Sequence, residues 1–165
     1  MILPTVPGPI CGPETGSILD IMAIQTMTTT ELTSELNKAL EAEYQAVVMY
    51  TTYAAAIQGP YRPQLRAFFQ SEIPDELGHA QFLADKVVAL GGYPSVEPAE
   101  VPRATDAQEM LRNVRDAEQN AIRTYQRLAK AADEMGEKGL ATRLETILED
   151  ETGHFEETEK ILAGW

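Results

Sequence analysis

The sequence predicts an all-α protein, an antiparallel four-helix bundle with a long crossover between its second and third helices. The composition is rich in Ala, Leu, Glu and Gln, which favour helix. Apolar residues recur at three- and four-residue steps in four separate stretches, as expected for one buried face per helix. A Pro- and Gly-rich segment at residues 91–104 divides these stretches into two pairs. Fully extended, it spans roughly 46 Å, enough to cross a bundle from end to end. We therefore expect parallel second and third helices and halves related by an approximate two-fold axis.

The first 27 residues differ from the rest of the chain. We divide the protein into an extended Pro/Gly-rich arm at residues 1–27 and a bundle at residues 28–165. Four prolines block helix formation up to about Ile18, and the absence of Lys and Arg argues against a signal peptide. The arm either packs on a neighbouring subunit or forms a disordered tail. Cys11 is the only cysteine, which excludes a disulfide framework and a zinc ribbon.

The first helix of the bundle is predicted to begin at Thr28, which forms a capping box with Glu31. Gly59 and Pro60 are expected to end it. The second helix runs from about residue 63 to residue 90. Because Pro74 lies inside it, we expect a kink or local bulge there.

The third helix is predicted to begin with Thr105 and Gln108 as its cap. A short turn bracketed by Gly136 and Gly139 leads into the fourth helix. With 165 residues, the chain is long enough for one domain with a proper core.

The charge balance limits the partners of this protein. The formal net charge is −13 at pH 7, which argues against nucleic-acid binding because that function needs a basic surface. No stretch approaches about 18 uninterrupted apolar residues, so we expect no membrane-spanning helix and a cytoplasmic protein.

One motif occurs twice, 75 residues apart. It reads Asp75-Glu76-Leu77-Gly78-His79 in the first half and Asp150-Glu151-Thr152-Gly153-His154 in the second. The only two histidines of the chain both follow a glutamate by three residues, the spacing that places two side chains on one helix face. Two glutamates and two tyrosines repeat with the same offset. These pairs are Glu43 with Glu118, and Tyr50 with Tyr125.

Each half thus has one helix with Glu and a second with Glu-x-x-His, the ligand pattern of a dinuclear metal site inside a bundle. Four carboxylates in an apolar interior need two divalent cations to balance them, and oxygen and imidazole ligands suit iron or manganese. We expect Glu76 and Glu151 to bridge the metals and Glu43 and Glu118 to be terminal. The alternative is a pair of surface Glu–His contacts. The six predicted ligands are Glu43, Glu76, His79, Glu118, Glu151 and His154.

Other residues are expected beside the ligands. A metal-bound imidazole usually donates its second N–H to a carboxylate, and the two-fold axis suggests that Asp75 pairs with His154 and Asp150 with His79. The alternative is that both aspartates are simply exposed. Glu72, one turn before Glu76, is either a seventh, asymmetric carboxylate or a partly solvated residue at the core edge; we favour the latter.

Two repeated pairs remain to be assigned. Tyr50 and Tyr125 either hydrogen-bond the ligands, give up an electron, or are ordinary core tyrosines. Gly78 and Gly153 lie inside the ligand turns, where we expect a neighbouring helix to approach closely.

The segments Leu36-Asn37-Lys38-x-Leu40-x-x-Glu43 and Asp150-Glu151-x-Gly153-His154 resemble the first- and fourth-helix motifs of bacterioferritins, within the ferritin-like superfamily. The resemblance covers about residues 28–163. It implies a ferritin-like fold and a di-iron ferroxidase centre that oxidises Fe(II) with O2 or H2O2. It also implies the six ligands above and the near-site Tyr50.

The chain departs from that family at several points. Leu77 stands where bacterioferritins have the haem-binding methionine, so we expect no haem. Rubrerythrins, which are also similar, have an extra ligand glutamate where this chain has Ala121. The short fifth helix of cage ferritins is missing, so we expect a homo-oligomer, a dimer or larger, rather than a 24-subunit cage.

Four functions compete at this point. The leading one is ferroxidase-type oxidation of Fe(II) in iron handling or oxidative-stress protection. The second is a rubrerythrin- or manganese-catalase-like peroxide scavenger. The third is a di-iron oxygenase acting on an organic substrate. The fourth is a non-enzymatic helical interaction module.

Overall fold

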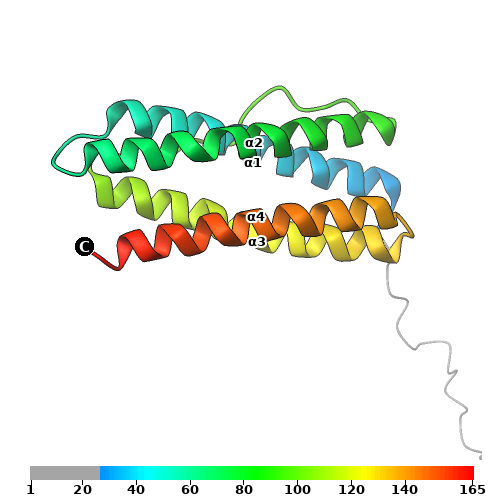
Figure 1. Cartoon of the computed structure of the whole chain (residues 1–165). Coiled ribbons are helices and arrows are strands. Elements are labelled where there is room, and N and C mark those ends of the chain that lie inside the picture. The colour runs from blue at the N-terminus through cyan, green and yellow to red at the C-terminus, as the bar shows by residue number, and fades with distance from the viewer. Residues whose placement is uncertain (1–26) are drawn as a thin grey trace, which may run out of the picture.

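A computed structural model describes residues 27–165, and this part of the chain forms a bundle of four α-helices (Figure 1). The helices pack as two pairs, α1 with α2 and α3 with α4. The predicted all-α four-helix bundle is therefore confirmed. The helices are α1 (Thr29–Ala56), α2 (Arg62–Ala89), α3 (Ala107–Glu134) and α4 (Lys138–Leu162).

The predicted arm lies outside the described residues except for Met27, which packs against the core. Among the described helices, none has a stretch both long and apolar enough to cross a bilayer. Helix α2 contains Pro74 and continues on both sides of it.

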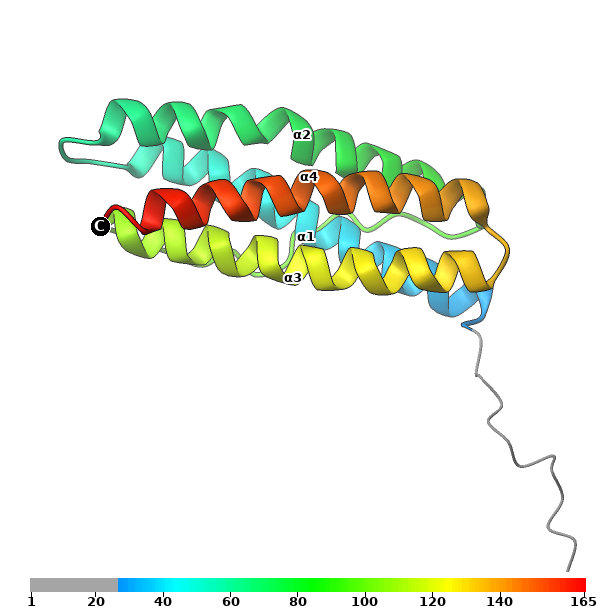
Figure 2. The same cartoon turned by 60° about the horizontal axis from the view of Figure 1, so that its bottom comes forward.

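The connection between α2 and α3 runs back along the length of the bundle, so that these two helices are parallel, as predicted (Figure 2). It is tied to α1 through polar side chains one turn apart. Asn37 Nδ2 donates to the Tyr93 carbonyl at 3.0 Å, and the Ser95 N–H donates to Asn37 Oδ1 at 2.9 Å. The Ser95 hydroxyl donates to Glu41 at 2.8 Å. These contacts hold a segment without regular secondary structure against the bundle.

The predicted capping box of α1 is confirmed. The Glu31 N–H donates to Thr28 Oγ1 at 3.2 Å, and the Thr28 N–H donates to Glu31 Oε2 at 2.8 Å. Helix α1 ends slightly earlier than predicted, with Ile57 as its C-cap, and Gly59 follows with φ of 91°.

The predicted cap of α3 at Thr105 and Gln108 is wrong. Asp106 is the N-cap, and its Oδ1 accepts a hydrogen bond from the Glu109 N–H at 2.9 Å. A carboxylate satisfies this free N–H and also interacts favourably with the positive end of the helix dipole, which explains why the helix begins one residue later.

The apolar core is divided into two clusters. One includes Leu36, Leu83 and Leu144, and the other includes Tyr53 and Phe69. On α1, α2 and α3 the predicted metal ligands lie in the sequence between the residues of these clusters. The polar centre of the bundle therefore lies between two apolar clusters, one toward each end of the bundle.

Gly92, at the start of the crossover, allows α2 to end close to α1. A Cβ atom there would lie 2.4 Å from Thr33 Cγ2 and 3.1 Å from Val87 Cγ1. We predict that Gly92→Ala lowers the free energy of unfolding by about 1–3 kcal/mol through overpacking. Thr33→Ser, which removes the clashing methyl group, should recover part of this loss. Chemical denaturation measures both effects.

Gly78→Ala is the matched control for this test. A Cβ atom at Gly78 meets nothing within 4 Å, so this substitution should stabilise α2 by about 1 kcal/mol. Equal effects of the two alanine substitutions would contradict the proposed close approach at Gly92.

Candidate metal centre

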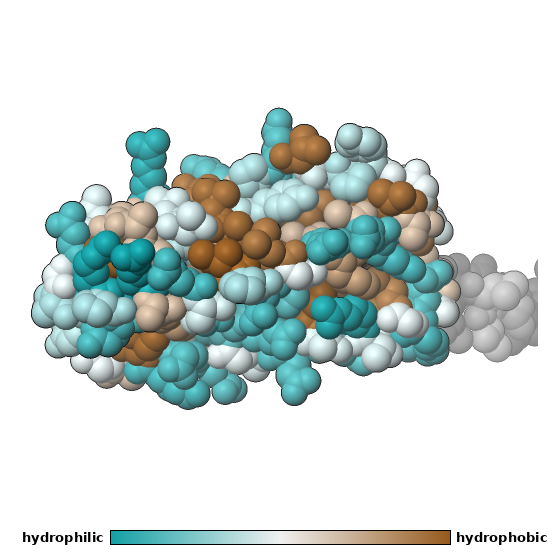
Figure 3. Space-filling view, turned by 45° about the horizontal axis from the view of Figure 1, so that its top comes forward, coloured by the Kyte–Doolittle hydropathy of each residue, from teal (hydrophilic) through white to brown (hydrophobic). Residues whose placement is uncertain are grey.

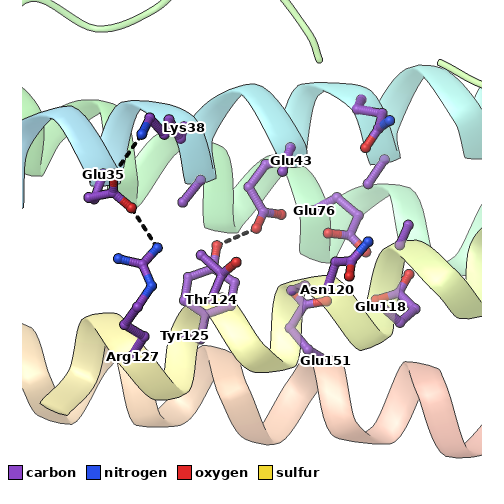
Figure 4. A pocket seen from close by; sticks show the side chains of 16 residues that line it. Glu35, Lys38, Glu43, Glu76, Glu118, Asn120, Thr124, Tyr125, Arg127 and Glu151 are labelled. Atoms are coloured by element: carbon purple, nitrogen blue, oxygen red, sulfur yellow. Dashed lines mark hydrogen bonds and ion pairs between the residues drawn. The ribbon is translucent and has the colours of Figure 1, made fainter. Parts of the chain in front are cut away.

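All six predicted ligands converge in the centre of the bundle. The four glutamates are almost completely buried, at 1–3% exposure, and the two histidines are also buried. Every helix contributes: α1 and α3 one glutamate each, and α2 and α4 a glutamate and a histidine each. Figure 4 shows the four carboxylates turned toward one another between the helices.

The ligand atoms form two adjoining groups, and within each group they lie within 4.8 Å of one another. We call these groups metal position 1 and metal position 2. Two glutamates, Glu76 and Glu151, belong to both groups. Position 1 consists of Glu43, Glu76, His79 and Glu151, and position 2 consists of Glu76, Glu118, Glu151 and His154.

The inner nitrogen of each histidine faces carboxylates of the opposite half. His79 Nδ1 lies 2.9 Å from Glu151 Oε1, and His154 Nδ1 lies 3.4 Å from Glu76 Oε1. Neither Nδ1 makes an aligned hydrogen bond within the described residues, and Glu43 Oε2 also lacks a partner. Buried polar atoms without partners are costly, so their convergence fits metal cations as the missing partners. The oxygen and imidazole donor set is one that iron and manganese accept.

The two repeated tyrosines form crossed hydrogen bonds between the halves. Tyr50 on α1 donates to Glu118 Oε1 on α3 at 2.6 Å, and Tyr125 on α3 donates to Glu43 on α1. Both rings are fully buried. Each tyrosine thus occupies one oxygen of Glu118 or Glu43 and leaves the other oxygen free to face the centre.

The outer nitrogens of the two histidines have different partners. His79 Nε2 lies 3.3 Å from Asp150 Oδ2, the pairing expected from the two-fold axis. His154 Nε2 lies 3.0 Å from Glu72 Oε2 but 3.8 Å from Asp75 Oδ2. The expected Asp75–His154 pairing is therefore replaced by Glu72, which is closer and better buried.

The expectation of close helix approach at Gly78 and Gly153 is wrong. A Cβ atom at either position would meet nothing within 4 Å. Nothing in the structure explains why glycine repeats here.

Comparison with known families identifies this architecture. A family model described as a ferritin-like domain matches residues 33–164. The chain belongs to the ferritin-like family. The predicted ferritin-like fold and its kinship with bacterioferritins are thereby confirmed.

Three ferritin-like proteins are similar to this chain in sequence or structure. A crystal structure of ferritin-like, diiron-carboxylate proteins from Bacillus anthracis str. Ames is 41% identical, covers 81% of this chain and 96% of that one, and has a TM-score of 0.80. The bacterioferritin of Desulfovibrio desulfuricans is 27% identical over 127 residues, covering 76% of this chain and 71% of that protein. A bacterioferritin-related dodecameric thioferritin from Bacteroides fragilis is 25% identical, covers 84% and 88% of the two chains, and has a TM-score of 0.75.

The electrostatics of this centre favour bound protons. Burial raises the pKa of Glu43 to about 8 and that of Glu118 to about 7. For Glu76, burial acts in the same direction, but charge interactions with His154 and His79 outweigh it and lower the pKa to about 2. Burial alone would lower the pKa of the histidines, but the surrounding carboxylates raise it to about 12 for His79 and about 11 for His154.

We predict that binding two divalent cations at pH 7 releases at least about three protons per chain, because the cations displace protons from both histidines and from the carboxylates of Glu43, Glu118 and Glu151, whose pKa burial raises. Metal affinity should therefore fall as the pH is lowered. Calorimetric titration of Mn(II) in buffers with different ionisation enthalpies measures the release. Binding without proton release would contradict the protonated cluster.

We predict that Glu72→Ala weakens one of the two metal-binding steps about 10–100-fold, because it removes the carboxylate that orients His154. Asp75→Ala is the control, since Asp75 is 62% exposed and lies farther from the histidine. Stepwise Mn(II) titration followed by electron paramagnetic resonance distinguishes the two steps. Equal effects of the two substitutions would argue against a specific role for Glu72.

Proposed function

We propose that this ferritin-like chain binds two iron ions through Glu43, Glu76, His79, Glu118, Glu151 and His154 and oxidises Fe(II) with O2 or H2O2. Manganese is the alternative metal. The observation that carries the proposal is that Glu76 and Glu151 belong to both ligand groups, an arrangement that would hold two cations side by side.

The proposed reaction transfers two electrons to one molecule of O2 or H2O2. Two Fe(II) ions supply them on becoming Fe(III), and two electrons with two protons convert O2 to H2O2, or H2O2 to two waters. When bound, paired iron supplies this one-electron chemistry at two neighbouring positions. Such a centre would serve iron handling or protection against peroxide.

The chain's own residues keep the paired site intact. Glu76 and Glu151 set the two positions next to each other. Tyr50 and Tyr125 fix the terminal carboxylates by hydrogen bonds from the opposite half. The apolar clusters on either side lower the local dielectric constant, which would strengthen the interaction between the carboxylates and the cations.

We further propose that the protein acts as a homo-oligomer. Hydrophobic side chains reach the surface on the face seen in Figure 3, and the exposed apolar residues include Leu77 on α2 and Tyr93 and Val96 on the crossover. Exposed apolar surface often marks an interface. The Bacteroides fragilis relative is described as dodecameric. A monomeric mass in native mass spectrometry would disprove this part of the proposal.

Rapid mixing of Fe(II)-loaded protein with O2 and, separately, with H2O2 tests the proposed reaction. We predict that Glu151→Gln slows Fe(II) oxidation more than about tenfold, because it removes a carboxylate shared by both metal positions. Glu149→Gln, an exposed change on the same helix, is the matched control and should leave the rate unchanged.

The two oxidants also separate the competing functions. Oxidation by both supports the ferroxidase proposal, whereas reaction with H2O2 alone favours a peroxide scavenger. Stable metal binding without any oxidation would indicate a structural metal site. No metal binding at all would indicate a helical interaction module.

A further inference from the structure

A cavity of about 220 Å³ lies between α1 and α3 and leads from the surface to the ligand carboxylates (Figure 4). Glu43 and Glu118 lie at its inner end, and Lys38 and Arg127 lie at its outer end. Neither histidine lines it. The cavity therefore approaches the centre from the side of α1 and α3.

The cavity is larger than a pair of metal ions requires. A single water occupies about 30 Å³ in the liquid, and an apolar cavity of about 150 Å³ engineered in another protein binds benzene. Two cations among the carboxylates would fill only the inner end. The remaining space extends about one and a half helical turns along α1, from Glu43 to Lys38, and is large enough for a small organic molecule.

Alanines from both helices form the apolar part of the walls, at positions where a larger side chain would close the gap. These alanines are Ala39, Ala42, Ala46, Ala117 and Ala121. The polar side chains of Gln45, Asn120, Thr124 and Tyr125 form the rest of the walls.

The mouth of the cavity is cationic. Glu35 pairs with Lys38 at 2.7 Å and with Arg127 at 2.5 Å, so one carboxylate faces two cations. Arg127 is half exposed and has further N–H donors that can bind an anion. This charge disfavours a bare metal cation at the mouth and favours an organic anion.

We propose that the cavity between α1 and α3 binds a small organic monocarboxylate of about the size of benzoate. Its carboxylate contacts Arg127 and Lys38, its apolar body lies between the alanines, and its far end points toward the metal pair. This inference rests on the proposed metal centre, because two divalent cations balance the four ligand carboxylates that would otherwise repel an anion.

Benzoate is the probe for the test, added to the full-length protein loaded with Mn(II). Mn(II) speeds the relaxation of nearby protons, so proton NMR reports the orientation of bound benzoate. We expect the para proton to relax fastest and the ortho protons slowest. No enhancement, or the strongest enhancement at the ortho protons, would overturn the proposal, since the latter places the carboxylate on the metal.

Bound Mn(II) is measured first by electron paramagnetic resonance, which separates the two proposals. A chain that holds two Mn(II) ions but no benzoate disproves only the organic-acid site. A chain that binds no Mn(II) disproves the metal centre and, with it, this site.

Substitutions inside and outside the cavity test whether benzoate binds there. Ala121→Leu should abolish benzoate binding by filling the cavity, and Ala67→Leu, the same change at an exposed position on α2, should not. Arg127→Gln should weaken it about tenfold, whereas Arg123→Gln, one turn earlier and outside the cavity, should have no effect. If Ala121→Leu no longer holds manganese, Arg127→Gln decides, and an unchanged affinity in that variant overturns the proposal.

Discussion

The structure depends on one electrostatic constraint, the burial of four carboxylates at a single point inside a helical bundle. Placing an ionised carboxylate in an apolar interior costs several kcal/mol even after relaxation. Interactions within the bundle offset part of this cost. Two buried tyrosines donate hydrogen bonds to Glu43 and Glu118, and two histidines lie among the carboxylates. Unpartnered atoms nevertheless remain on five of these side chains, all within the part of the chain that the structure describes. Paired cations are the simplest way to satisfy them.

The near two-fold symmetry of the chain explains how two similar halves form two adjoining ligand groups. Each half supplies a glutamate that belongs to one ligand group, a glutamate that belongs to both, a histidine and a tyrosine, and each tyrosine donates a hydrogen bond to the other half. The symmetry fails at Glu72, whose partner 75 residues later is Ile147. The two candidate metal positions therefore differ in the carboxylate that supports their histidine, Asp150 for His79 and Glu72 for His154.

Much of this arrangement could be predicted from the sequence because periodicity and spacing determine it. The Glu-x-x-His turns place two side chains on one helix face, and the long Pro/Gly-rich segment requires a crossover. The choice between Glu72 and Asp75 as the partner of His154 could not be predicted, because it depends on a side-chain orientation that spacing does not specify. The cavity depends on the distance between α1 and α3. The alanines on these helices leave room for a cavity, but their presence in the sequence does not predict one. The cap at Asp106 was missed because Thr105 offers an equally plausible N-cap residue.

The most direct test of the central claim is an anomalous-scattering map from crystals of the protein grown with Fe(II) or Mn(II). The account predicts two neighbouring peaks per chain, one at each metal position, both in contact with Glu76 and Glu151. A single peak, or ions bound only at surface carboxylates, would contradict the paired centre on which the proposed function depends.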